Sequence, residues 1–233
     1  MSKLVVIEDL SRRDAIRRIA LALTAAGAGA LDYASAQEVH RHVAEESTAS
    51  GEYKRKFLNE HEWATVKRLA ELILPADEKG GSAADAGAVE FIDLLCSESE
   101  RLQRIYTGGI AWQDSLMRTR FGAEFVAASE EQQVEMLDTL VAAEEALRQD
   151  RDAQGDFSAE AHYARFRDYG IAQRSDLTAA VGFFDWARKM IVDAYYTSQV
   201  GIQDLGYVGN DALSEYKVPD GLFEQVMRKS PFV

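Results

Sequence analysis

Hydrophobic and polar positions follow a helical period through the body of the chain, most clearly between Asn59 and Pro75. Apolar residues recur there every three or four positions, at Trp63, Val66, Leu69, Ala70 and Ile73. Asn59 can cap the backbone three residues on and Glu62 can reach back, which forms a capping box. Because Pro75 cannot continue the helix, the helix is predicted to end at Leu74.

Further stretches with the same period predict more helices. They begin near Ala88, cover 101–120 with an interruption at Gly108-Gly109, run from Ser129 through Leu147, and cover 177–198. The apolar set of the Ser129 helix is Val134, Leu137, Leu140, Val141 and Leu147. Alternating strand patterns are almost absent. The predicted fold class is therefore all-α, an irregular helical bundle of about six helices with a Gly-rich C-terminal tail.

Polarity divides the chain into three segments. Residues 1–36 form a candidate signal segment, residues 37–56 are interpreted as a polar linker or arm, and residues 57–233 form the helical domain. The first segment holds five basic and four acidic residues and so nets +1, whereas the rest of the chain carries −14 of the total net charge of −13. Residues 1–36 therefore differ in charge from the rest of the chain.

The segment Ser11 to Arg17, which contains the pair Arg12 and Arg13, resembles a twin-arginine export signal, although Ala15 departs from its usual pattern. A mildly apolar run from Ile19 to Leu31 follows, and Ala34-Ser35-Ala36 offers a small-x-small cleavage site. The order of these features predicts export to the periplasm by the twin-arginine route. The alternative is an amphipathic N-terminal helix. Whether the segment is cleaved or retained stays open.

The acidic composition excludes some partners. The net charge of −13 and the isoelectric point near 4.8 repel phosphate backbones and anionic lipid. We therefore expect no nucleic-acid partner, and membrane contact only through the signal segment or through a complex.

The residue types that carry chemistry are sparse. The chain has one cysteine, Cys96, which the helical pattern places among buried apolar residues. None of its four histidines has a metal-ligand partner at i+3 or i+4 of the kind that zinc or di-iron sites use. Nucleotide-binding and nucleophile motifs are missing from the sequence. We predict no catalytic, cofactor-binding or metal-binding residue in this chain.

One acidic loop imitates a calcium site. The stretch that starts at Asp150 follows the first nine positions of an EF-hand loop, including Gly155 at the sixth. The twelfth position is Ala161, however, so the bidentate carboxylate is missing. A solvated acidic turn is the favoured interpretation, and calcium binding is an alternative.

Three stretches of the chain form a recognisable signature: 69–77 (LAELILPAD), 86–93 (AGAVEFID) and above all 195–210 (YYTSQVGIQDLGYVGN), with its spacing of Tyr and Gly. Through them the chain resembles the gluconate 2-dehydrogenase subunit 3 family over most of residues 57–216. The resemblance implies a small subunit without a cofactor of its own. Its partner would be a large FAD-containing dehydrogenase of the glucose-methanol-choline type, and a cytochrome c subunit often completes such complexes.

The same C-terminal signature supplies the candidate partner interface. Tyrosine gives a large contact area at low rotamer cost, and glycine allows close backbone approach. Tyr207, close to two glycines, is the anchor that we expect to project from a tight turn. Ordinary helix packing is an equal alternative for Tyr195 and Tyr196. The candidate interface residues are Tyr195, Tyr196, Gly201, Leu205, Gly206, Tyr207, Gly209 and Asn210.

Together these features predict a non-catalytic, periplasmic small subunit of an FAD-dependent sugar, polyol or glycoside dehydrogenase complex. Its role would be to assist folding, export or assembly of the flavoprotein. The alternative is an independent periplasmic enzyme or a calcium-binding helical protein.

Overall fold

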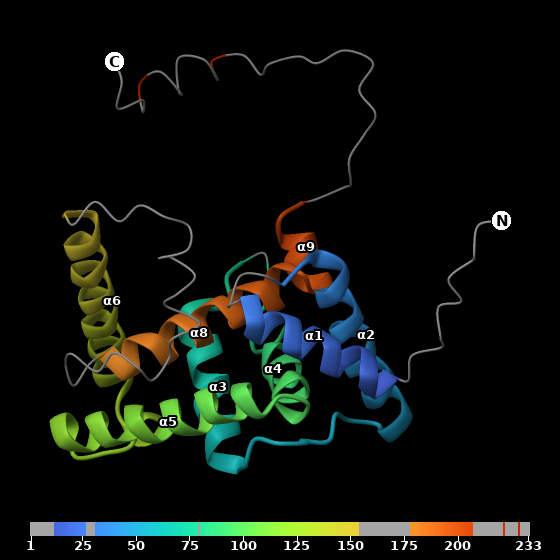
Figure 1. Ribbon diagram of the computed structural model, residues 1–233, viewed down its shortest axis with the longest axis horizontal. Coiled ribbons are helices and arrows are strands. Elements are labelled where there is room, and N and C mark those ends of the chain that lie inside the picture. Colours follow the sequence, from blue (N-terminus) through green and yellow to red (C-terminus); the bar gives the residue numbers. More distant parts are fainter. Residues whose placement is uncertain are drawn as a thin grey trace.

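The computed structural model is an all-α bundle, which confirms the predicted fold class (Figure 1). It describes residues 12–26, 31–78, 80–153 and 178–206, together with Gly221 and Arg228. Within these residues there are eight α-helices, one short 3-10 helix (η1) and no strand. The helices are α1 (Arg12–Ala26), α2 (Tyr33–Ser50), α3 (Glu60–Ile73), α4 (Ala88–Ser97), α5 (Glu100–Phe121), η1 (Phe125–Ala127), α6 (Glu130–Ala153), α8 (Thr178–Tyr196) and α9 (Gln199–Asp204).

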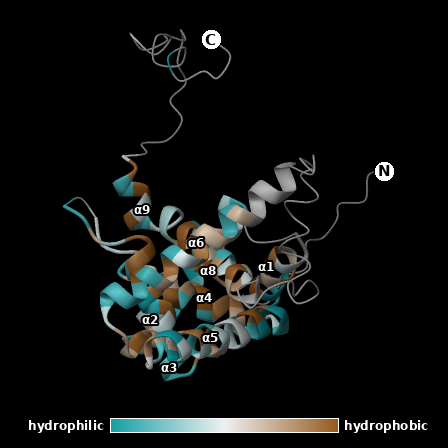
Figure 2. Cartoon of the chain, turned by 90° about the vertical axis from the view of Figure 1, so that its left-hand side faces the viewer, coloured by the Kyte–Doolittle hydropathy of each residue, from teal (hydrophilic) through white to brown (hydrophobic). Residues whose placement is uncertain are grey.

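Helix α4 is the centre of the bundle. Eight of its ten residues are buried, and α1, α2, α3, α5 and α8 all pack against it. Its apolar residues lie in the middle of the molecule in Figure 2. Cys96 belongs to this core and is fully buried, as predicted, and burial raises the pKa of its thiol. A helix that is apolar on nearly every side needs neighbours all round it, which explains the arrangement.

Helix α3 begins as the sequence predicts. The Asn59 side chain accepts a hydrogen bond from the Glu62 backbone N–H, and the Glu62 carboxylate accepts one from the Asn59 N–H, so the capping box is complete. The helix ends at Ile73, with Leu74 as its C-cap just before Pro75.

Helix α5 is continuous from Glu100 to Phe121, so the predicted interruption at Gly108-Gly109 is wrong. Gly109 is buried where α5 crosses α8, and a Cβ at this position would lie 2.6 Å from the Cβ of Phe183 and closer still to its ring. On α5, Tyr106 packs edge-on against the same ring at 5.8 Å. Gly109 therefore permits close helix packing and does not break the helix.

Helix α2 differs from the expected polar linker or arm. Residues 37–50 are helical, and Ala36, Val39 and His42 are buried. The loop that follows is anchored by the buried carboxylate of Asp93, which accepts hydrogen bonds from the Tyr53 hydroxyl and from three backbone N–H groups, those of Lys56, Phe57 and Leu58. Helix α2 has few apolar residues because only a narrow side of it contacts α4. Its sequence therefore resembles that of a polar linker.

Helix α6 stands at the edge of the bundle (Figure 1). Leu137 and Leu140 are buried against the body, as predicted, but Val134 and Val141 are 40% and 43% exposed. Helix α6 has more apolar residues than it buries, because α8 is the main helix that packs against it and covers only one side. No helix in the described ranges is both long enough and apolar enough to span a membrane.

Candidate functional site

The predicted partner interface begins at the corner between α8 and α9. Ser198 caps α9: its hydroxyl accepts a hydrogen bond from the Gly201 N–H at 3.0 Å and donates one to the Tyr195 carbonyl at 2.7 Å. A Cβ at position 201 would lie 2.7 Å from the Tyr195 carbonyl carbon and closer still to its oxygen. Gly201 is buried, and because it has no side chain it lets the chain fold back closely on Tyr195 at this corner.

The structure gives the two adjacent tyrosines different surroundings. Tyr195 is 5% exposed, and its hydroxyl donates a hydrogen bond to the Asp204 carboxylate at 3.3 Å. Burial, reinforced by Asp204, raises the pKa of Tyr195. Tyr196 packs edge-on against Tyr195 but is 37% exposed. Tyr195 thus holds α9 onto α8, and Tyr196 is the one available for an external contact.

Beyond this corner the chain presents Leu205, which is 60% exposed. Gly206 follows with φ of +62°, a left-handed conformation that favours glycine. The remaining predicted interface residues, Tyr207, Gly209 and Asn210, lie outside the described residues.

The first turns of α2 lie beside the end of α8. Gln37 donates a hydrogen bond to the Thr197 carbonyl, and the His40 imidazole pairs with the Thr197 hydroxyl at 3.1 Å. Tyr33, one turn before Gln37, is 57% exposed. Sequence reasoning missed Tyr33 because it lies in the segment assigned to the export signal. Tyr33, Tyr196 and Leu205 are large exposed hydrophobic residues at one end of the bundle, and we call these three residues the aromatic corner.

A partly buried acid lies near this corner. Asp193, on the last turns of α8, has its pKa raised to about 6 by burial, and Lys189 counteracts this only in part. One of its carboxylate oxygens is buried without a hydrogen-bond partner. The cost of burying the charged form makes Asp193 a group whose protonation affects the stability of this end of the bundle.

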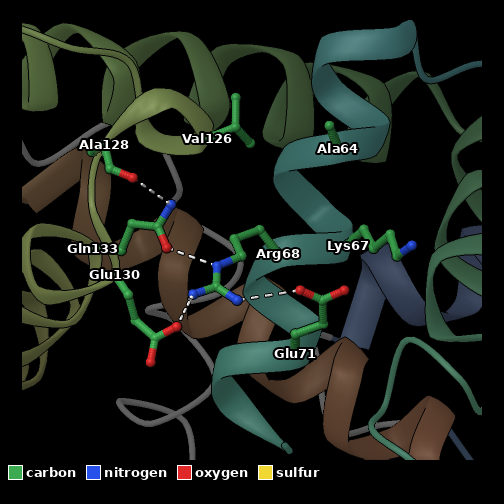
Figure 3. Close-up of a pocket in the computed structure, with 8 residues that line it drawn as sticks. All are labelled: Ala64, Lys67, Arg68, Glu71, Val126, Ala128, Glu130 and Gln133. Carbon is green, nitrogen blue, oxygen red and sulfur yellow. Dashed lines mark hydrogen bonds and ion pairs between the residues drawn. The ribbon is translucent and has the colours of Figure 1, made fainter.

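A hollow of about 420 Å³ lies between α3 and the start of α6, and the side chains that line it link the two helices (Figure 3). The Arg68 guanidinium points into it and donates hydrogen bonds to Gln133 at 2.7 Å, Glu130 at 2.8 Å and Glu71 at 3.3 Å. Gln133 in turn donates to the Phe125 carbonyl at 2.7 Å. Because the guanidinium already faces two carboxylates and an amide, its geometry ties α3 to α6 and does not resemble an anion site.

The structure also pairs a histidine with a distant acid. His61 Nε2 lies 2.6 Å from the buried Asp114 carboxylate, whose other oxygen accepts a hydrogen bond from the Phe125 N–H at 2.9 Å. The other ring nitrogen lies 3.8 Å from Glu124. Both imidazole nitrogens therefore face carboxylates, an arrangement that tethers η1 to α3 and α5. Sequence reasoning did not find the pair because 53 residues separate its members.

Metal chemistry has no candidate cluster in the described ranges, where no group of three or more His, Cys, Asp or Glu residues converges. Of the EF-hand-like stretch, Asp150 to Ala153 belong to α6, and residues 154–161 lie outside the described residues. Calcium binding therefore remains a sequence-based alternative.

Comparison with known proteins gives one match. The family model described as gluconate 2-dehydrogenase subunit 3 matches residues 60–214, which is more than half of the chain. No curated protein and no solved structure matches. The matched range starts with α3 and includes the α8–α9 corner, whereas α1 and α2 precede it.

Proposed function

The chain belongs to the gluconate 2-dehydrogenase subunit 3 family, and from this membership we propose that it is the non-catalytic small subunit of a periplasmic, FAD-dependent dehydrogenase complex. The partner is a large flavoprotein of the glucose-methanol-choline type that oxidises a sugar, polyol or glycoside. A cytochrome c subunit is a further candidate partner. In this proposal the flavin belongs to the partner, and this chain assists folding, export or assembly of the flavoprotein.

The match to the family model is the observation that carries the proposal. Two residues of the aromatic corner, Tyr196 and Leu205, lie in the C-terminal part of the matched range and support a contact role for it. Tyrosine and leucine side chains that lie in water in the free subunit gain hydrophobic free energy when a partner covers them, at roughly 25 cal/mol per Å² of apolar surface. Aromatic side chains that lose little rotamer freedom on binding are enriched among residues that dominate interfaces.

The first test is whether the neighbouring reading frame encodes a large flavoprotein. Co-expression of the two chains, followed by purification on a tag carried by one of them, then tests the proposal. We expect the wild-type chain to co-purify with a yellow flavoprotein. Leu205→Asp should weaken recovery of the flavoprotein by more than about tenfold, because a buried interface anchor is typically worth about 2 kcal/mol. Tyr207→Ala tests the anchor predicted from the sequence in the same assay.

Val141→Asp is the matched control, because Val141 is also an exposed aliphatic residue but lies on α6, away from the aromatic corner. Its recovery should equal that of the wild type. If the wild-type chain and a folded flavoprotein do not co-purify, the subunit role is wrong. If Leu205→Asp and Tyr207→Ala both bind normally, the complex exists but its contact lies elsewhere.

A further inference from the structure

The helix that carries the twin arginines is a core helix of the folded chain. Ile16, Ala20 and Leu23 follow the i, i+4, i+7 spacing of one helix face and are at most 3% exposed. Helix α1 packs on α4 and also contacts α2 and α5. Leu21, on the opposite face of the same helix, is 53% exposed. Within α1, the apolar run that the sequence suggests for an export signal is therefore divided between the core and the surface.

A polar contact also fastens α1 to the body. Arg13 Nε donates hydrogen bonds to both carboxylate oxygens of Glu98, at 3.0 and 3.2 Å. Glu98 is the C-cap residue of α4, and its side chain is only 14% exposed. Since the Arg13 side chain is 80% exposed, this ion pair orients the helix more than it stabilises it. The buried face of α1 is the main attachment.

The predicted cleavage site lies in the first turn of α2. Asp32 caps this helix, and its carboxylate accepts hydrogen bonds from the Ser35 N–H at 2.9 Å and the Ser35 hydroxyl at 2.7 Å. The Ala36 N–H donates to the Asp32 carbonyl at 3.0 Å, and Ala36 is fully buried. A peptidase that cuts after a small-x-small sequence has to bind it in an accessible form. This turn would have to unwind and Ala36 leave the core first.

We infer that α1 lies docked on the folded chain of the exported subunit and thereby shields the Ala34-Ser35-Ala36 site, so that the subunit keeps its N-terminal helix. This inference rests on the proposed export, because the twin-arginine route carries folded proteins and its substrates meet the peptidase folded. Helices α1 and α2 contact each other and both pack on α4, so loss of α1 from α4 also removes a neighbour of α2, the helix that holds the Asp32 cap and the buried Ala36. The surface on which α1 lies is then an intramolecular docking site whose occupant is this chain's own signal helix.

The test is digestion of the purified full-length chain with bacterial signal peptidase, followed by intact-mass measurement. The wild-type chain should stay near its full mass of 25.9 kDa. Leu23→Asp removes a buried contact and frees α1, so it should be cut after Ala36 at least about tenfold faster, because proteolysis follows the population of the opened form. Leu21→Asp is the matched control on the exposed face and should resist like the wild type. If Leu23→Asp unfolds as a whole, Leu23→Ala takes its place.

Two results would overturn the inference. One is a folded wild-type chain that is cut after Ala36 as fast as Leu23→Asp. The other is a synthetic peptide of residues 25–45 that the peptidase leaves intact, because a site that is not cut when unfolded needs no shielding. Cell fractionation tests export separately: a wild-type chain that stays in the cytoplasm contradicts the proposed location, whereas the digestion alone decides the shielding.

Discussion

The two adjacent glycines of α5 should respond in opposite ways to the same substitution. Gly108 is exposed, and a Cβ added there meets nothing within 4 Å. Gly109 is buried, and a Cβ there would lie 2.6 Å from the Cβ of Phe183. Because that Cβ is fixed to the backbone of α8, a rotamer change of the Phe183 ring cannot remove the clash. Helices α5 and α8 would have to move apart.

The sizes of the opposing effects predict the sign at each position. Replacing glycine by alanine inside a helix contributes about 1 kcal/mol to stability through backbone entropy. Gly108→Ala should therefore stabilise the chain by about 1 kcal/mol. Inserting a methyl group into a packed core typically costs 1–3 kcal/mol, and a contact with a Cβ belongs at the upper end of about 3 kcal/mol. Gly109→Ala should then destabilise the chain by a net of about 2 kcal/mol.

Urea unfolding followed by far-ultraviolet circular dichroism measures both variants against the wild type. We expect the two free energies of unfolding to differ by about 3 kcal/mol, with the wild type between them. The double variant Gly109→Ala/Phe183→Ala should be less destabilised than the two single effects added, because truncating the ring removes part of the clash. If Gly109→Ala is as stable as Gly108→Ala, the close crossing of α5 and α8 is wrong.

Four further results are expected. Asp193→Asn should raise the melting temperature at pH 7.5 but not at pH 4. The pKa of Asp193 is about 6 in the folded chain and 3.8 ordinarily, so folding is favoured while this carboxyl is protonated. The stability that Asp193 contributes is therefore full below pH 4 and is lost as the pH rises through 6. Equal shifts at both pH values would contradict this. Asp93→Ala should cost about 3 kcal/mol in urea unfolding, because it leaves three backbone N–H groups and a phenol of the 51–58 loop without their acceptor; a loss below about 1 kcal/mol would show that water replaces the carboxylate. Replacing both Arg12 and Arg13 by lysine should leave the chain and its flavoprotein in the cytoplasm on fractionation, and unchanged periplasmic levels would refute the export route. Calorimetry with calcium should show no micromolar binding, whereas micromolar binding that Asp150→Ala abolishes would favour the EF-hand alternative.

The sequence by itself determined the features that depend on neighbouring residues. Helical period, the Asn59 capping box and the stop at Pro75 are local, so they predicted α3 almost to the residue. The near absence of alternating patterns was enough to predict an all-α fold. The family could also be identified, because its signature is a spacing of residue types along the chain and needs no contact to be seen.

Only the tertiary structure decided the features that depend on partners far along the chain. The apolar face of α2 is a few residues wide and becomes visible only when α4 covers it. Gly109 marked a helix break in the sequence, and Phe183, more than 70 residues away, shows that it marks a close packing contact. Tyr195 and Tyr196 were equal candidates until the fold buried one and left the other exposed. A residue's type sets what it can do, but burial and contact depend on which distant elements the fold brings against it.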